Sequence, residues 1–368
     1  MILTKFTAES YRNIERASLS FRPGVNLLFG NNAQGKTNVL EGIYTFARGK
    51  SFRAASDADQ VRFGDLGFSI GIGFESEGRE RELSYRYYEG RRVRKKNGAT
   101  VTLHEMIGLF RAVLFCPEHL SLVKGGPSER RQFLNIALCQ LDGRYLSALS
   151  AYQKNLENRN ALLKMAQKTG YLDEGALSAF SHGMAVAADT LYTRRADYIE
   201  RLSFYARAHA REMSGAREEI TLRYLSDVDA LVSAAGGRVY EAYETLFSAS
   251  LPREIAAGTS LFGPHRDDID ILLGDLPLRA FGSQGQQRPA VLAIKLAEGA
   301  LSEERTGECP VYLFDDVLSE LDDGRRAYIL SDMKGKQMIL TACECGGIEP
   351  YLTNVIYTEG GSYAPAHR

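Results

Sequence analysis

The chain has 368 residues, and its 44% hydrophobic and 25% charged content is that of an ordinary soluble globular protein with room for two domains. A net charge of −1 excludes a whole-molecule field that recruits nucleic acid or membrane, so a polyanion would have to bind a local basic patch. No apolar run approaches the roughly 20 residues of a membrane span, and the early charges of the N-terminus are not those of a signal peptide, so we expect a cytoplasmic protein.

Residues 1–125 are predicted to form mainly strands and turns. The segments ILTKFTAESY and ASLSFRPGVNLLFG bracket the first predicted strands, and apolar and polar residues alternate from Gly67 to Leu103 around glycine-containing turns. A further short apolar segment, RAVLFCPEHLSLV, closes this region.

The segment GNNAQGKT, from Gly30 to Thr37, fits the pattern of a phosphate-binding loop. It follows an apolar strand and opens a helix with apolar residues at helical spacing, which is the context that such a loop requires. The glycines let backbone N–H groups turn toward phosphate oxygens, Lys36 supplies a mobile charge for the β- and γ-phosphates, and Thr37 supplies a hydroxyl ligand for Mg²⁺. The candidate nucleotide-binding residues here are Gly30, Asn31, Asn32, Ala33, Gln34, Gly35, Lys36, Thr37 and Asn38.

Helical spacing of apolar residues replaces alternation after residue 127. Apolar positions recur in steps of three and four between Leu134 and Leu156, and Thr169–Gly170 ends this helix. A second helix is predicted from Leu177 to Tyr205, and its apolar stripe is interrupted at Arg194–Arg195. Two helices of about 35 residues joined by a short turn predict an antiparallel hairpin with arms of about 50 Å.

Beyond Gly258 the chain returns to a mixed α/β pattern that ends in a short polar tail. A buried-strand run, Val311 to Phe314, ends at Asp315 and Asp316. Two carboxylates at the end of an apolar strand are costly unless a cation or hydrogen bonds receive them. Asp315 is therefore the predicted Mg²⁺-side ligand, and Asp316 is placed to orient or deprotonate an attacking water. Asp316 and Lys36 are the candidate catalytic residues, whereas Asp322 is better explained as a helix cap.

A second loop-to-helix junction lies in GSQGQQRPAVLAIKL, where Ser283, Gln284, Gly285 and Gln286 precede a clean helical pattern. An ordinary Ser-Gly turn that caps a helix is one explanation. However, one triphosphate does not need two such junctions from the same subunit. We therefore expect these four residues to bind a nucleotide held by another copy of the chain.

The pieces combine into a prediction for the domain organisation. Residues 1–125 and 258–368 should form one discontinuous domain with a shared site, and residues 126–257 should form an inserted helical arm. The expected fold class is α/β, with a mixed sheet and helices around the phosphate-binding loop, plus this arm domain. The five cysteines are scattered and typical of reduced thiols; Cys343-x-Cys345 could be a metal fragment, but the sequence offers no matching pair.

Several motifs carry a resemblance to a known family. GNNAQGKT, SQGQQR and LFDDVLSELD, with a helical insertion between the first two, resemble the ABC-type ATPase heads of the SMC and Rad50 class. More narrowly, YRNIERASLSF, FCPEHLSLVKGGPSERRQFLN and FGPHRDDIDI are similar to segments of the RecF family. The resemblance covers essentially the whole chain.

The resemblance implies an ATP- and DNA-binding protein of recombinational repair and replication restart, active in the SOS response to DNA damage. Such proteins bind ATP with Mg²⁺, form homodimers through it and hydrolyse it slowly, as weak DNA-stimulated ATPases. They bind double-stranded DNA near single-strand gaps and junctions, and with RecO- and RecR-type mediator proteins they help to load the RecA recombinase.

The same resemblance implies roles for individual residues. Lys36 would contact the β- and γ-phosphates, and Thr37 and Asp315 would serve Mg²⁺. Asp316 would stand where many relatives carry a hydrolytic glutamate, and Ser283–Gln286 would meet the γ-phosphate of the partner's nucleotide. Ser319–Asp322 would face the partner subunit, and Arg12–Asn13 would lie near the nucleotide.

Two departures from the wider ABC pattern favour slow hydrolysis. Where many heads have a histidine after the next strand, this chain has Thr341, whose hydroxyl can hydrogen-bond a γ-phosphate but cannot become a cation. Asp316 is also one methylene shorter than glutamate. Both features suit a clamp whose ATP-bound state persists.

The DNA-binding surface is less well defined by the sequence. The densest basic run, Arg91, Arg92, Arg94, Lys95 and Lys96, is predicted at a hairpin tip, where a solvated charged turn is an equally good explanation. Arg130–Arg131 and Arg194–Arg195 are further candidates at the base of and on the helical hairpin. Because no recognition-helix motif or aromatic-interleaved basic face is evident, we expect binding that is selective for DNA structure and independent of its sequence.

Three other classes of protein explain less of the sequence. A P-loop kinase that acts on a small substrate, with the helical insertion as a lid, leaves SQGQQR without a role. A structural tether of the SMC type would need a much longer hairpin. A transporter ATPase subunit would be expected to carry the histidine and a shorter insertion.

Overall fold

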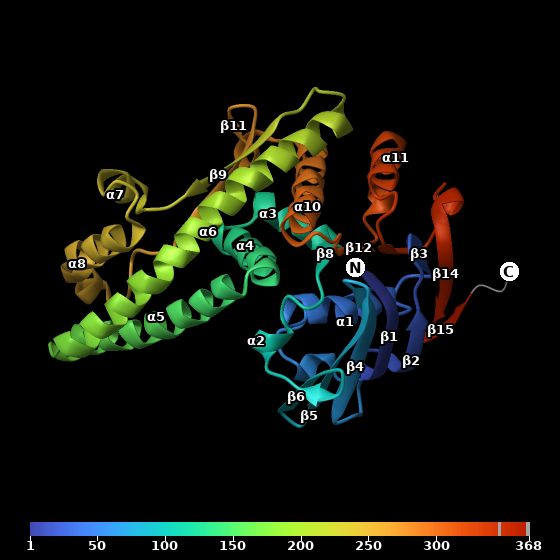
Figure 1. Cartoon of the computed structure of the whole chain (residues 1–368), viewed down its shortest axis with the longest axis horizontal. Coiled ribbons are helices and arrows are strands. Elements are labelled where there is room, and N and C mark those ends of the chain that lie inside the picture. The colour runs from blue at the N-terminus through green and yellow to red at the C-terminus, as the bar shows by residue number, and fades with distance from the viewer. Residues whose placement is uncertain (345–346, 366–368) are drawn as a thin grey trace. The chain divides into compact units, whose positions relative to one another are not determined.

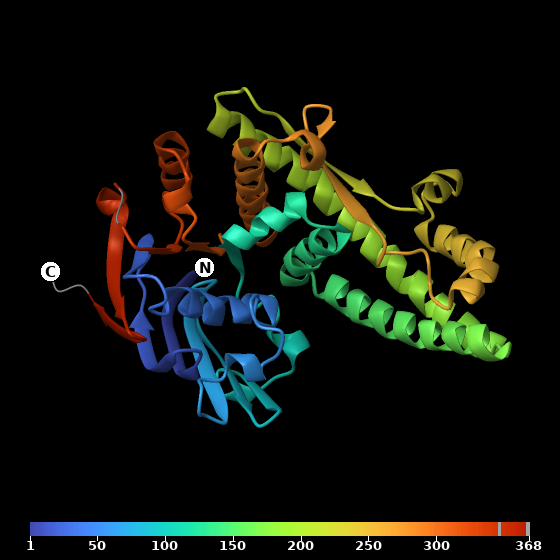
Figure 2. The ribbon, with the colours of Figure 1, turned by 180° about the vertical axis from the view of Figure 1, so that it is seen from behind.

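The computed structural model describes residues 1–344 and 347–365, and the chain divides into two compact units. The first unit consists of Met1–His119, His209–Arg217 and Val291–Arg368, and the second consists of Leu120–Ala208 and Glu218–Ala290. Figure 1 and Figure 2 show the elements of both units from opposite sides.

An antiparallel sheet of six strands forms one layer of the first unit, in the order β2-β1-β4-β5-β6-β7. Its strands are Ile2–Tyr11 (β1), Ile14–Ser20 (β2), Gly67–Ser76 (β4), Arg79–Tyr88 (β5), Arg91–Lys96 (β6) and Ala99–Thr100 (β7). Alternation along β4 is clear: the apolar residues Phe68, Ile70, Ile72 and Phe74 are buried on one face. The other face of β4 carries small residues at the alternate positions 67, 69, 71 and 73.

The second sheet of this unit also has six strands, in the order β15-β14-β3-β13-β12-β8. They are Val25–Phe29 (β3), Ala112–Phe115 (β8), Val311–Asp315 (β12), Met338–Ala342 (β13), Leu352–Glu359 (β14) and Ser362–Pro365 (β15). Every neighbouring pair is parallel except the β14–β15 hairpin. Strands β12 and β13 are buried along their whole length, as expected for a parallel sheet that is covered on both faces.

The parallel arrangement decides where the site lies. Because the carboxyl ends of parallel strands meet at one edge, the segments that follow β3, β12 and β13 converge there. The predicted "short polar tail" is corrected by this sheet, since β14 and β15 continue ordered pairing to residue 365. The local sequence does not predict this hairpin, because β3, the strand with which β14 pairs, comes from the other end of the chain.

Helix α1 (Lys36–Arg48) packs against strands of both sheets of the first unit. Its apolar residues at helical spacing are fully buried. Gly42 is needed for this close approach, because a Cβ there would lie 2.7 Å from the ring of Phe6. Gly49, with φ of 84°, ends the helix in the left-handed conformation. The remaining helices of this unit are α2 (Leu103–Met106), α11 (Asp323–Asp332) and the part of α10 (Gln284–Thr306) from Val291 onward.

The second unit is built on an antiparallel hairpin of helices α5 (Gly143–Thr169) and α6 (Glu174–Ser214), of which the last six residues belong to the first unit. Arg159 on α5 donates to Ser181 on α6, and Tyr145 accepts from Arg195, so early residues of one helix face late residues of the other. Gly170 ends α5 in the left-handed conformation, as the sequence predicts. The other elements are α3 (Ser121–Lys124), α4 (Pro127–Leu141), α7 (Asp229–Ala234), α8 (Val239–Ala257), α9 (Leu278–Phe281) and the sheet of β9 (Ile220–Leu225), β10 (Asp268–Leu273) and β11 (Leu276–Pro277).

One prediction about this hairpin was wrong. The first long helix is two helices, because Asp142 takes an extended conformation with φ of −140° between α4 and α5. Its side chain accepts from the backbone N–H of Arg144 at 2.8 Å and so caps α5. A side chain that satisfies a free N–H group favours a new helix start over continuation of the old helix.

The arginine that interrupts the apolar stripe of α6 is part of the core of the second unit. Arg195 is 2% exposed, and it donates to the carbonyl of Pro264 at 2.6 Å and to the carboxylate of Asp267 at 2.9 Å. A buried guanidinium is tolerated because each of its three nitrogens donates a hydrogen bond to a neighbouring residue. This cluster therefore ties α5 and α6 to the segment that precedes β10.

The division in the structure differs from the predicted domain boundaries. Residues 218–290 group with the helical hairpin, since β10 pairs with β9 along six residues and Asp267 binds Arg195. Residues 209–217 group with the first unit, where His209 contacts the hydroxyl of Tyr328 at 2.8 Å. Among the described residues, every helix is too short or too polar to cross a bilayer.

Candidate nucleotide-binding site

The loop after β3 closes around the side chain of Lys36. Gly35 is left-handed, with φ of 107°, and a Cβ there would lie 2.8 Å from both the Asn13 side chain and the Tyr363 hydroxyl. Lys36 begins α1 and is 4% exposed. Its ammonium donates to the carbonyls of Gly30 and, at 3.2 Å, Asn31. The loop thus holds a full positive charge at a helix N-terminus, which is a site for an anion.

The carboxylate of Asp315 lies beside Thr37, the next residue of the loop. The Thr37 hydroxyl donates to Asp315 Oδ1 at 2.8 Å, although 278 residues separate the two in the chain. Burial raises the pKa of the Asp315 carboxyl above its ordinary value, and the hydroxyl donors from Thr37 and Thr341 oppose this shift only in part. A buried carboxylate next to a hydroxyl suits a hard divalent cation such as Mg²⁺, which would favour the ionised form.

Thr341 connects the two adjacent aspartates. Its hydroxyl donates to Asp315 Oδ1 at 2.9 Å and accepts from the backbone N–H of Asp316 at 3.0 Å. Asp316 is left-handed, with φ of 53°, which is a strained conformation for a residue with a side chain. In this structure the Thr341 hydroxyl is therefore engaged in holding the two aspartates at the end of β12.

Three residues that contact the loop were not predicted from the sequence. The Tyr363 hydroxyl on β15 donates to the carbonyl of Gly35 at 3.2 Å, and the backbone N–H of Gly361 donates to the carbonyl of Gln34 at 3.2 Å. Cys343 follows β13, and its thiol lies 3.1 Å from the Lys36 ammonium and 2.9 Å from the Asn32 side chain. The position of Cys343, just beyond a parallel strand, was a usable signal, whereas nothing local marks Tyr363.

Four of the five cysteines lie within the described residues. Cys116, Cys139, Cys309 and Cys343 are free thiols. Cys345, the second residue of the possible metal fragment, lies outside the described residues. Within residues 1–344 and 347–365, no group of three or more histidine, cysteine, aspartate and glutamate side chains is arranged to hold a metal.

The predicted pair Arg12–Asn13 divides between two partners in the first unit. The Asn13 side chain accepts from Asn38 at 2.7 Å and so lies at the first turn of α1. Arg12 donates to the fully buried Glu41 carboxylate, at 3.0 Å from Nε. Asn13 thus borders the phosphate-binding loop, and Arg12 anchors the preceding strand to the second turn of α1.

The second predicted junction, Ser283–Gln286, lies at the start of α10 in the second unit. The carbonyl of Ser283 accepts from the backbone N–H groups of Gln286 and Gln287 at 3.0 and 2.9 Å. Ser283, Gln284 and Gly285 are exposed, so this helix N-terminus faces solvent in the single chain. The loop from Ser319 to Asp322 follows Asp316, and Asp322 caps α11 by accepting from Arg325 at 2.9 Å, as expected.

A family model described as RecF/RecN/SMC N terminal domain matches residues 2–350. The "DNA replication and repair protein RecF" of Geobacillus thermodenitrificans is 39% identical over 351 residues, which cover 95% of this chain and 94% of the relative. The chain belongs to the RecF family. A second relative of that name, from Lacticaseibacillus casei, is 37% identical over 352 residues and 95% of each chain.

Comparison with solved structures agrees with membership in the RecF family. A structure of the "recombination mediator protein RecF-ATP in RecFOR pathway" is 32% identical, with a TM-score of 0.92 and coverage of 100% of this chain and 98% of that chain. The Smc head domain from Pyrococcus furiosus is 16% identical with a TM-score of 0.57, which supports the fold alone. The predicted fold class, an ABC-type ATPase head with a helical insertion, is confirmed.

Several of the arginines that the sequence offered as candidates for DNA contacts have partners among the described residues. Arg130 donates to both carboxylate oxygens of Asp268, at 2.6 and 2.9 Å. Arg131 donates to the carbonyl of Asp267 and Arg194 pairs with Asp142, while Arg195 is buried. These four arginines were candidates for phosphate contacts, and the structure gives each of them a partner within the chain. The run from Arg91 to Lys96 forms strand β6 and not a hairpin tip.

Replacement of Asp315 by asparagine tests the charge at this site. Because burial raises the carboxyl pKa, the ionised form destabilises the folded protein at neutral pH. Asp315→Asn keeps the Oδ1 acceptor, so we expect the Tm without nucleotide to rise by roughly 2–4 °C, while Mg²⁺ no longer increases ATP affinity. As the pH falls through the raised pKa, the wild-type carboxyl binds a proton and the difference in Tm should shrink. Asp323→Asn, at a fully exposed carboxylate, is the matched control; a lower Tm for Asp315→Asn at neutral pH would contradict this explanation.

Proposed function

We propose that this chain is an ATP-gated, DNA-binding dimer of recombinational repair and replication restart, and a weak DNA-stimulated ATPase. The observation that carries the proposal is the Thr37–Asp315 hydrogen bond, which joins a phosphate-binding loop to an acidic strand end in one unit. The family adds support, because its members are named DNA replication and repair proteins and one is solved with ATP.

In the proposed complex Lys36 leaves the Gly30 and Asn31 carbonyls and binds the β- and γ-phosphates of ATP. Thr37 and Asp315 hold Mg²⁺, which neutralises phosphate charge. The backbone N–H groups of residues 30–38 surround the phosphates. The exposed Ser283–Gln286 loop contacts the γ-phosphate of a nucleotide bound by a second copy, so ATP is held from both sides only in the dimer.

Asp316 is proposed to orient or deprotonate the attacking water. Its main chain is fixed by Thr341, and its carboxylate is one methylene shorter than a glutamate at the same position. Asp316→Asn should keep ATP binding and dimerisation but lower turnover by about 100-fold, which traps the dimer on DNA. Steady-state hydrolysis with DNA measures this, and Asp323→Asn is the control. Wild-type turnover in Asp316→Asn would show that another group activates the water.

DNA is the proposed polyanionic partner, bound where a duplex meets a single-strand gap. Because the net charge of the whole chain is −1, a local group of cations must recruit the DNA, and strand β6 carries the densest run of basic residues in the sequence. RecO- and RecR-type mediators are the proposed protein partners, since related structures are described within a RecFOR pathway. We also propose that the protein helps to load RecA, acts in the SOS response and is located in the cytoplasm.

Two measurements test this function together. Sedimentation velocity with ATP, ADP and no nucleotide should show a dimer with ATP alone, and a gel shift should show tighter binding of gapped duplex with ATP. A monomer under all three conditions overturns the gated dimer. ATP consumption that responds to a small metabolite and not to DNA would instead favour the kinase.

A further inference from the structure

We propose that the exposed face of the β5–β6 hairpin binds unpaired bases of single-stranded DNA. The inference rests on the proposed DNA-binding function and names the part of the DNA that this surface takes. The surface consists of Phe63, Leu66, Arg86, Tyr88, Arg91 and Lys95, called here the aromatic–basic patch. Every residue of the patch belongs to the first unit.

The charge of the hairpin opposes that of the whole chain. Residues 79–96 contain eight basic and three acidic side chains, a net charge of +5 in a chain of net charge −1. Three tyrosines, at positions 85, 87 and 88, lie among these cations, so the expectation that the chain has no basic face with interleaved aromatic residues was wrong. Basic side chains mixed with aromatic rings are typical of surfaces that bind single-stranded nucleic acid.

The strand register separates the cations of β6 into two groups. Arg92 lies opposite Tyr87 and binds Asp57, and Arg94 lies opposite Tyr85 with its guanidinium 4.7 Å from the ring centroid. Both face the side of the sheet that carries the buried tyrosine. Arg92 and Arg94 therefore have partners within the chain, and only some of the cations of β6 are available to bind a ligand.

The alternate residues face solvent. Arg91 lies opposite Tyr88, and Lys95 lies opposite Ser84, so both share the exposed face of the sheet with Arg86. None of these three cations forms an ion pair with another described residue. Arg91 and Lys95 are about 13 Å apart along β6, a spacing that follows from four residues of strand. They can neutralise phosphates along a strand that crosses the hairpin.

The aromatic part of the patch lies where β4 begins. Phe63 is completely exposed (102%), Leu66 is 61% exposed and Tyr88 is 43% exposed. The carbonyl of Leu66 accepts from the backbone N–H of Glu89 at 3.2 Å, which joins the end of the segment that carries Phe63 to the residue that follows Tyr88. A hollow of about 450 Å³ next to Tyr88 is lined by Leu66, Gly67 and Arg86, among others. Exposed apolar side chains in one region mark a binding surface.

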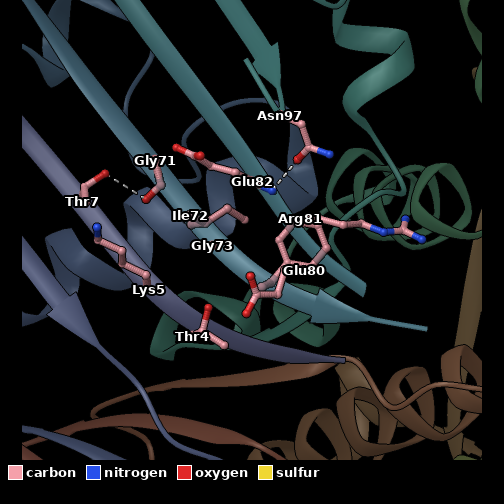
Figure 3. A pocket seen from close by; sticks show the side chains of 11 residues that line it. Thr4, Lys5, Thr7, Gly71, Ile72, Gly73, Glu80, Arg81, Glu82 and Asn97 are labelled. Carbon is pink, nitrogen blue, oxygen red and sulfur yellow. Dashed lines mark hydrogen bonds between the residues drawn. The ribbon is translucent and has the colours of Figure 1, made fainter. Parts of the chain in front are cut away.

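The carboxylates define the limits of this surface. At the other end of the same sheet face, a hollow of about 500 Å³ over Gly71 and Gly73 is lined by the carboxylates Glu80 and Glu82 and by the cations Lys5 and Arg81 (Figure 3). This hollow therefore has no excess of positive charge to attract an anionic strand. Near Tyr88, Asp65 pairs with Arg62 at 3.8 Å, Glu89 lies in the turn between β5 and β6, and Glu9 lines the hollow. The positive charge of the patch comes from Arg86 and Arg91 at this end, and from Lys95, which lies farther along the hairpin opposite Ser84.

Single-stranded DNA fits the patch better than duplex DNA or an acidic peptide. The rim of a duplex presents phosphates and sugars, which give a fully exposed phenylalanine nothing to stack on. Unpaired bases offer flat faces to Phe63 and Tyr88 while their phosphates reach the cations. An acidic peptide would use the charges but would leave the rings without flat partners.

Anisotropy titration of a labelled oligothymidine, without nucleotide, tests the inference. Tyr88→Ala should weaken binding by about 10- to 100-fold, and Tyr88→Phe, which keeps the ring, should bind like the wild type. The double variant Arg91→Ala, Lys95→Ala should reduce the slope of log K against log salt by about 1.4. Tyr171→Ala, at a 64% exposed tyrosine of the second unit, is the control and should have no effect.

Three results would overturn the inference. Tyr88→Ala could bind like the Tyr171→Ala control; it could lose affinity equally for a duplex of the same length; or polyglutamate could compete as well as oligothymidine, which would indicate an acidic protein partner. Because the titration omits ATP, it is independent of the nucleotide-gated dimer. Failure of ATP-dependent dimerisation with intact oligothymidine binding would therefore reject the proposed gating and leave this surface in place.

Discussion

Lys36→Ala is expected to weaken ATP binding by about 100-fold or more and to abolish ATP-dependent dimerisation. The side chain is the positive charge enclosed by the loop after β3, and its ammonium is already within 3.2 Å of the Asn31 carbonyl. Hydrogen bonds from a charged donor to phosphate are stronger than those between neutral groups, and the variant loses all of them. Nucleotide titration by fluorescence and sedimentation with ATP measure the two effects.

The variant should retain its fold. Alanine has the highest helix propensity, so α1 can still begin at residue 36, between the two sheets that hold it. Lys50→Ala, at an exposed lysine just after α1, removes the same charge outside the loop and should bind ATP like the wild type. If Lys36→Ala bound ATP with wild-type affinity, the loop after β3 would not be the nucleotide site.

Ser283→Arg is expected to leave ATP binding by the single chain unchanged and to weaken dimerisation by at least about 30-fold. Ser283 is exposed, and its carbonyl, which survives the substitution, accepts the N–H groups that open α10. The arginine side chain would occupy the space in which the partner's γ-phosphate is proposed to lie. Disruption at the centre of an interface typically costs this much affinity or more.

Two assays on the same variant separate the in-trans role from a local one. Nucleotide titration below the dimerisation concentration should match the wild type, while sedimentation with ATP should show a monomer. Ser178→Arg, on the exposed surface of α6, adds the same side chain elsewhere in the second unit. Equal loss of ATP binding and dimerisation in Ser283→Arg would contradict a role across the dimer.

The parts of the site that the sequence predicts are those with a local pattern. The loop from Gly30 to Thr37 has fixed spacing and flanking periodicity, and Asp315 ends a run of buried residues. Their meeting also follows from sequence, because a parallel sheet brings the carboxyl ends of its strands to one edge. In the structure, the Thr37 hydroxyl oxygen and Asp315 Oδ1 are 2.8 Å apart.

The features that the sequence analysis missed depend on long-range partners. Tyr363 supports Gly35 across 328 residues, and no local pattern connects the two. Arg195 looked like a surface charge because periodicity does not show the buried Asp267 that receives it. The alternate exposure of β6 was also missed, since a run of five cations reads as a charged turn until the register against β5 is known.

The central claim is that ATP is enclosed between two copies of this chain. Determination of the structure of the ATP-bound assembly, with Asp316→Asn to slow hydrolysis, tests it most directly. The account predicts that Ser283 or a backbone N–H of residues 284–286 from one copy lies within hydrogen-bonding distance of the γ-phosphate held by Lys36 of the other. An ATP-bound assembly in which this loop faces solvent, far from either nucleotide, would contradict it.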